Sequence, residues 1–131
     1  MKPLPPLLAL LLAAGCAAPR PSAPVRDVVY SAVGADPFWM LTIGEDRIVL
    51  TRGGPGDERP HESVYPRALP REVDGVRIWQ SGEGVQAITI EARPGRCVGP
   101  SGILYEDQVR VRLTGLELEG CGGRMFAGRR G

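Results

Sequence analysis

The sequence contains few lysine, histidine, cysteine and aromatic residues. Of its 131 residues, 5% are aromatic, one is a histidine, three are cysteines, and Lys2 is the only lysine. So few cysteine and histidine residues argue against a zinc site, which needs several such ligands at close spacing. The 16 basic residues nearly balance the 15 acidic ones, and the formal net charge is +1. Without a basic stripe interleaved with aromatics, the sequence does not predict nucleic-acid binding.

Signatures of catalysis are also missing from the sequence. It contains no Gly-x-Ser-x-Gly turn, and no phosphate-binding Gly-rich loop joins a strand to a helix. The single histidine, His61, lies near Asp57, Glu58 and Glu62, and solvated charge is the simpler interpretation of this group. Paired carboxylates for glycoside hydrolysis are a spatial arrangement that a sequence leaves open. We therefore expect no enzyme, no metal and no cofactor.

No hydrophobic run is long enough to span a bilayer. The apolar run at residues 7–12 follows Lys2, which is the layout of a secretory signal. It ends at Ala13-Ala14-Gly15-Cys16. This segment resembles the signal of bacterial lipoproteins, in which the cysteine is acylated and becomes the first residue, although Leu12 lies one place farther from the cut than usual. The alternative is an ordinary cleaved signal, because the same small residues suit a general signal peptidase.

The lipoprotein resemblance implies a location for the mature chain. Acyl chains on Cys16 would form an essentially permanent anchor, because each buried methylene contributes about 0.8 kcal/mol. Ala17, rather than Asp, follows the cysteine, and in enterobacterial-type lipoproteins this implies transport to the outer membrane. We expect residues 1–15 to be the signal peptide and the mature protein to face the periplasm. The expected partners are the membrane, and an envelope protein or a small ligand.

Two cysteines, Cys97 and Cys121, remain after Cys16. Export places them in an oxidising compartment, so an even pair favours one disulfide over two buried free thiols. On the chain-entropy model such a bond contributes roughly 3 to 4 kcal/mol. A staple of this kind suits a single small domain with a thin core.

Short apolar-alternating runs separated by Gly, Asp and Ser predict strands and no convincing helix. The expected fold is all-β, a small antiparallel meander that forms a barrel or sandwich with one disulfide. We expect a Pro-rich tether at residues 16–26, the domain at 27–123, a mobile loop at 52–62 and a flexible tail at 124–131.

Three hairpins are expected. In the first, Leu41 and Ile43 face Leu50 and Ile48 across a turn at residues 44–46. The second joins residues 76–79 to residues 85–90 with its register open. In the third, a turn at Thr114-Gly115 pairs inward Val111 with Leu118 and also pairs the outward charges, Arg112 with Glu117 and Arg110 with Glu119.

Two segments carry a further resemblance. They are Gly34-Ala35-Asp36-Pro37-Phe38-Trp39, and Cys97 with Tyr105 and Gly120-Cys121 downstream. Together they resemble a family of uncharacterised bacterial envelope lipoproteins with an early Gly-x-Asp/Glu-Pro-Phe-Trp motif and a late Cys, Tyr and Gly-Cys. The resemblance covers roughly residues 28–121 and implies fold and location, but no activity. Residues 99–104 lack the acidic and Met residues usual in that family.

A shorter match involves residues 101–105, Ser-Gly-Ile-Leu-Tyr. It resembles a segment of the membrane-bound inhibitors of c-type lysozyme, which are disulfide-linked β-barrel lipoproteins. The resemblance implies that Ser101, with Arg110 or Arg112, would enter the lysozyme cleft. The alternative is that Ser101 belongs to a turn and Tyr105 to the barrel rim, with both arginines paired to glutamates.

The few aromatic residues are expected mostly in the core. Strand alternation places Phe38 and Trp39 on opposite faces, so one of them is a candidate for an exposed binding patch. Taken together, the sequence predicts an envelope-anchored, non-enzymatic binding module, with Phe38, Trp39, Ser101 and Tyr105 as candidate contacts. The alternatives are a c-type lysozyme inhibitor and an envelope glycan hydrolase.

Overall fold

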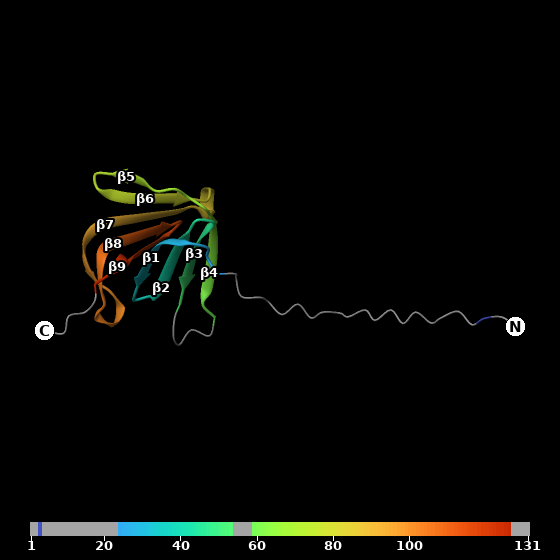
Figure 1. Cartoon of the computed structure of the whole chain (residues 1–131), viewed down its shortest axis with the longest axis horizontal. Helices are drawn as coiled ribbons and strands as arrows, with labels where there is room; N and C mark the ends of the chain where they lie inside the picture. The colour runs from blue at the N-terminus through green and yellow to red at the C-terminus, as the bar shows by residue number, and fades with distance from the viewer. Residues whose placement is uncertain (1–2, 4–23, 54–58, 127–131) are drawn as a thin grey trace.

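The chain folds into one antiparallel sheet that curls into a half-barrel (Figure 1). The computed structural model describes residue 3, residues 24–53 and residues 59–126, so Cys16 and the signal lie outside the described residues. The all-β expectation is confirmed. The sheet has nine strands in this described part: β1 (Val28–Gly34), β2 (Trp39–Gly44), β3 (Arg47–Arg52), β4 (His61–Pro66), β5 (Arg71–Val73), β6 (Val76–Ser81), β7 (Ile88–Val98), β8 (Leu104–Leu113) and β9 (Leu116–Met125).

Helical structure is limited to two short 3-10 turns, η1 (Gly84–Gln86) and η2 (Pro100–Gly102), within the described ranges. Across those same ranges, no helix has the length and apolar character to cross a bilayer.

The strand order is β4-β3-β2-β1-β9-β8-β7-β6-β5. Strands that are consecutive in the sequence pair with each other, except that β4 does not pair with β5. In addition, β1 pairs with β9 through Ala32 opposite Gly122 and Val33 opposite Cys121. Because the first and last strands pair, the free edges of the sheet are β4 and β5, which are consecutive in the chain. The expected meander is therefore correct, and it closes through its ends.

Alternating apolar side chains from both halves of the sheet fill the inside of the curl. Leu41 faces Leu50 and Ile43 faces Ile48, as the first hairpin predicts. Fourteen buried residues form the core cluster: Tyr30, Ala32, Trp39, Leu41, Ile43, Ile48, Leu50, Trp79, Ile88, Ile90, Ala92, Val109, Val111 and Leu118.

The other two hairpins also form. In the third, Arg110 lies opposite Glu119 and Arg112 opposite Glu117, and Gly115 supplies the positive φ of 73° that a two-residue turn needs. In the second, Trp79 lies opposite Ile90. The second strand of this hairpin was expected from residue 85 but begins at residue 88, because residues 82–87 form a longer turn that contains η1. Val85, in this turn, is 81% exposed.

Three expected boundaries need correction. The loop expected at 52–62 is strand at both ends, where β3 ends at Arg52 and β4 begins at His61, and residues 54–58 lie outside the described part. Arg124 and Met125 were expected in the tail but belong to β9, and residues 127–131 lie outside the described part. The tether expected through Arg26 is fixed at its end, because the Glu45 N–H donates to the Arg26 carbonyl at 3.1 Å.

The two free edges approach each other where β6 ends. The hydroxyl of Ser81, a buried residue, donates to the carbonyl of Pro66 at the end of β4. Pro66 has no N–H, which is why proline is tolerated on an edge strand such as this one. A side-chain hydrogen bond thus joins two strands that are not paired in the sheet.

Candidate binding site at the disulfide-linked hairpin

The disulfide Cys97–Cys121 forms as expected and joins strands that are not neighbours. Strands two places apart lie about 10 Å from each other in a regular sheet, yet the two Cα atoms are 5.5 Å apart. The pairing of β7 and β8 shifts between Pro94 and Cys97, and that of β8 and β9 shifts between Tyr105 and Asp107. Such bulges bend a strand. The end of the β7–β8 hairpin therefore folds toward β9.

A pocket of about 460 Å³ lies against this folded hairpin. Val109 and Val111 are buried in the core, so strand alternation turns Gln108 and Arg110, which line the pocket, to the outer face. Besides the disulfide, the residues that matter here are Val33, Glu91, Arg93, Val98, Arg110 and Glu119. The pocket thus combines apolar walls with charged groups.

Most charges around the pocket are already paired. Arg110 contacts Glu117 at 2.7 Å and Glu119 at 3.4 Å, while Arg112 contacts Glu91 at 3.1 Å. The expected Arg110–Glu119 contact is present. The expected Arg112–Glu117 contact is wrong, because the long side chains connect diagonally and across to β7.

Arg93 differs from the other charged residues of the pocket. It is exposed, and it contacts no carboxylate within the described part of the chain. A guanidinium presents five donors in a planar fork that suits a carboxylate or phosphate. The pocket therefore has one arginine side chain that pairs with no carboxylate of the described residues, although its arginines and glutamates balance in number.

Ser101 and Tyr105 both lie on the folded hairpin but do not line the pocket. Ser101 is exposed in η2 with a φ of 62°, in the left-handed region. Tyr105 is half-buried, and a Cβ added at Gly99 would come within 2.5 Å of its ring. The ring therefore covers Gly99 and shapes the turn, while the Ser101 hydroxyl faces solvent.

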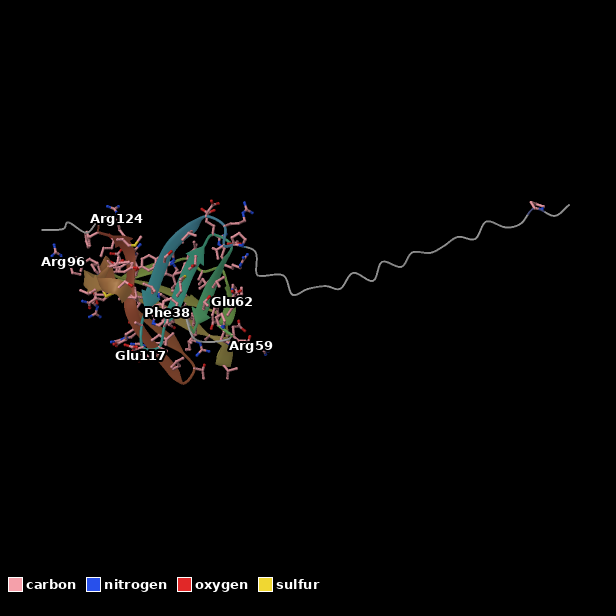
Figure 2. All side chains as sticks on the ribbon, turned by 90° about the horizontal axis from the view of Figure 1, so that it is seen from below. Phe38, Arg59, Glu62, Arg96, Glu117 and Arg124 are labelled. Carbon is pink, nitrogen blue, oxygen red and sulfur yellow. A yellow bond between two sulfur atoms is a disulfide. The ribbon has the colours of Figure 1, made fainter. Side chains whose placement is uncertain are left out.

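Trp39 has a structural role in the core, and Phe38 beside it is only partly buried. Trp39 is 1% exposed, and its Nε1–H donates to the Glu119 carbonyl at 3.2 Å. Its ring lies over Gly34 and Gly120, where an added Cβ would overlap it. Phe38 is half-buried, and Figure 2 shows it away from the Arg96–Arg124 end of the domain. Trp39 therefore belongs to the core, whereas Phe38 keeps part of its surface accessible and stays a candidate contact.

A buried polar cluster that the sequence reading missed lies inside the half-barrel. Asp107 is 5% exposed and accepts hydrogen bonds from the Tyr30 hydroxyl at 2.8 Å and from Arg77 at 3.2 Å. The Arg77 guanidinium lies 5.0 Å from the centre of the Tyr30 ring and 5.6 Å from that of Trp79. Burial, reinforced by the hydrogen bond to Asp107, raises the pKa of Tyr30 far above its ordinary value. Side-chain alternation could have revealed Asp107, because it lies an even number of residues from Val109 and Val111 and therefore shares their inward face.

The remaining sequence candidates do not converge on a site. His61 and Glu62 are exposed at the start of β4, and Asp57 and Glu58 lie outside the described residues, as does Cys16. Over residues 24–53 and 59–126, no group of three His, Cys, Asp or Glu side chains is placed to hold a metal ion.

No protein-family model, curated protein or solved structure matches the chain.

Proposed function

We propose that this chain is a non-enzymatic binding protein held at a bacterial envelope membrane by a lipid on Cys16, and that the pocket beside the disulfide holds its ligand. The observation that carries the proposal is the pocket itself. Its volume of about 460 Å³ falls within the range of about 300 to 1,000 Å³ typical of small-molecule sites.

The lining of the pocket indicates the chemistry of that ligand. Glu91 and Glu119 each have an arginine partner, whereas Arg93 has none in the described residues. Val33 and Val98 supply apolar surface on the same pocket. These features favour a small molecule with an apolar body and a carboxylate or phosphate group that the Arg93 guanidinium can bind.

Benzoate is a suitable probe because it joins an apolar ring to one carboxylate. We expect benzoate to produce saturable shifts of the backbone amide signals of Gly99 and Gly120, both of which line the pocket. Arg93→Ala should weaken this binding by at least several fold, since a charge-assisted hydrogen bond contributes roughly 1.5 to 3 kcal/mol.

Arg71→Ala is the matched control, because Arg71 is exposed on β5 and does not line the pocket. It should leave the benzoate titration unchanged. If benzoate shifts no pocket amide, or if both arginine variants behave like the unmodified chain, the pocket is not the anion-binding site proposed here.

The anchor has a separate test. With Cys16 intact, we expect the mature chain in bacterial membranes after a high-salt wash, carrying acyl chains on its first residue by mass spectrometry. Cys16→Ala should move it to the soluble fraction, because salt removes weak electrostatic attachment but not acyl chains. A Cys16→Ala chain that resists the salt wash would count against the lipid anchor.

Inhibition of c-type lysozyme is the second candidate function, and the observation that favours it is the exposure of Ser101 on the folded hairpin. Opposing it, Arg110 and Arg112 are both bound to glutamates. Lysis by c-type lysozyme is the measurement: an excess of the chain should leave the rate unchanged if the pocket proposal is correct. Inhibition that is lost in Ser101→Ala would instead establish the second candidate.

Glycan hydrolysis is less well supported. Glu91 and Glu119 both line the pocket, but Arg110 lies opposite each of them in the sheet register. Both carboxylates are bound to arginines, Glu119 to Arg110 at 3.4 Å and Glu91 to Arg112 at 3.1 Å, which does not favour a pair acting together on a glycosidic bond.

A further inference from the structure

Four large apolar side chains are exposed at one end of the domain. Val98 is 70% exposed, Met125 60%, Phe126 43% and Ile103 40%. We call these four residues the apolar tip. Isolated exposed apolar residues are normal, but a group of them marks a contact surface.

Strand pairing brings the apolar tip together from distant parts of the chain. Val98 ends β7 and lies opposite Leu104, and Met125 ends β9 opposite Tyr105. The Phe126 N–H donates to the Leu104 carbonyl at 2.9 Å. The ends of β7 and β9 and the start of β8 therefore meet at one end of the half-barrel (Figure 1).

Two arginines flank the apolar tip. Arg96 precedes Cys97 on β7 and Arg124 precedes Met125 on β9, and both are exposed. Figure 2 shows them at the same end of the domain. Neither contacts a carboxylate among the described residues. The nearby Glu106 is half-buried, with its side chain over Gly123.

We infer that the apolar tip docks on an anionic lipid surface, with its four side chains in the headgroup layer and Arg96 and Arg124 against lipid phosphates. Apolar side chains combined with unpaired basic ones are the combination that binds membrane interfaces. The positive charges of Arg96 and Arg124 favour an anionic lipid surface over a partner protein of undefined charge. This inference deepens the proposed function, because it assumes a chain held at a membrane and fixes how its domain is oriented there.

The experiment uses the full acylated chain in vesicles of phosphatidylcholine with about one third phosphatidylglycerol. Trp39 and Trp79 are both buried, so a new tryptophan reports on its own position. We expect brominated lipids to quench Phe126→Trp fluorescence at least two-fold more than that of Val85→Trp. Val85 is the matched control, since it is 81% exposed and apolar but lies in the β6–β7 turn.

Charge is tested in the same assay. Adding Arg96→Gln and Arg124→Gln to the Phe126→Trp chain should reduce the quenching, as should replacing the anionic lipid with phosphatidylcholine alone. Equal quenching of Phe126→Trp and Val85→Trp would overturn the inference. A concentration-dependent emission shift of Phe126→Trp without lipid, together with unquenched fluorescence on vesicles, would assign the tip to contact between copies and also overturn it.

Cosedimentation with the vesicles reports on the anchor, whereas quenching reports on docking. A chain that cosediments through Cys16 but shows no selective quenching refutes the docking alone. A chain that does not cosediment refutes both the anchor and stable docking.

Discussion

At the scale of single residues, Asp107 is a buried carboxylate inside the half-barrel. A buried carboxylate is costly unless it is paired and hydrogen-bonded. Here the Tyr30 hydroxyl and the Arg77 guanidinium supply the partners, and the two aromatic rings beside Arg77 add cation–π attraction. Tyr30 belongs to β1, Arg77 to β6 and Asp107 to β8. The cluster therefore joins both halves of the curl.

The raised pKa of Tyr30 predicts sensitivity to alkali. In the unfolded chain the Tyr30 phenol loses its proton near pH 10, whereas the folded chain keeps it protonated. The contribution of Tyr30 to the free energy of unfolding is therefore complete below about pH 10 and is lost as pH rises further. We expect Tyr30 to lower the free energy of unfolding by about 1.4 kcal/mol for each pH unit above that point. Denaturant titrations at pH 9, 10 and 11 measure it.

Tyr30→Phe removes the titrating group and should flatten this fall, while costing about 1 to 2 kcal/mol at neutral pH through the lost hydrogen bond. Tyr65→Phe is the control, because Tyr65 is only partly buried at the edge of the core. It should retain the alkaline fall. If Tyr30→Phe and the unmodified chain lose stability equally between pH 9 and 11, the assignment to Tyr30 is wrong.

The roles of Phe38, Trp39 and Tyr105 show what residue types alone do not reveal. Strand alternation and a short resemblance made them candidate binding contacts, whereas Trp39 fills the core against two glycines and Tyr105 covers Gly99. An aromatic next to a glycine in space can be far from it in sequence, as Trp39 is from Gly120. A local pattern therefore identifies such residues as important without identifying their partner.

At the scale of elements, the hairpins were the most predictable part of the fold. Side-chain alternation and turn residues together fix register over a few residues, which is why the pairs around Gly115 and residues 44–46 are correct. The bulges near Pro94 and Tyr105 were not predictable. They serve to fold one strand end toward β9, and the sequence does not show the direction of a bend.

The disulfide holds that bend, so its removal has a predicted cost. Replacing both Cys97 and Cys121 with Ala should lower the free energy of unfolding by roughly 3 to 4 kcal/mol, because the unfolded chain loses a crosslink over a separation of 24 residues. Denaturant titration with and without reductant measures this. Reductant should destabilise the unmodified chain and leave the variant unchanged. A variant as stable as the oxidised chain would contradict the prediction.

At the scale of the whole molecule, closure of the sheet depends on contacts between distant segments. The pairing of β1 with β9 joins Ala32 to Gly122 and Val33 to Cys121, and each strand is locally consistent with several neighbours. The pocket and the apolar tip depend on the same long-range arrangement. The sequence predicted the hairpins in which β7 and β9 begin, but not the later stretches that carry Arg93, Val98 and Met125, nor that Val98 and Met125 would lie at one end of the domain.

On the opposite side of the curl, a side-chain hydrogen bond links β6 to the end of β4. Ser81 is buried, and its hydroxyl donates to the carbonyl of Pro66 between strands that share no ladder. Ser81→Ala leaves that carbonyl without its donor and should lower the free energy of unfolding by about 1 to 2 kcal/mol.

Because β4 and β5 are the sheet edges, we expect Ser81→Ala to give faster amide hydrogen exchange in β4, β5 and β6, with β1, β8 and β9 unchanged. Gln80→Ala, at an exposed neighbouring position, should alter neither quantity. A uniform increase of amide exchange over all strands would show instead that β4 and β6 separate only when the whole domain unfolds.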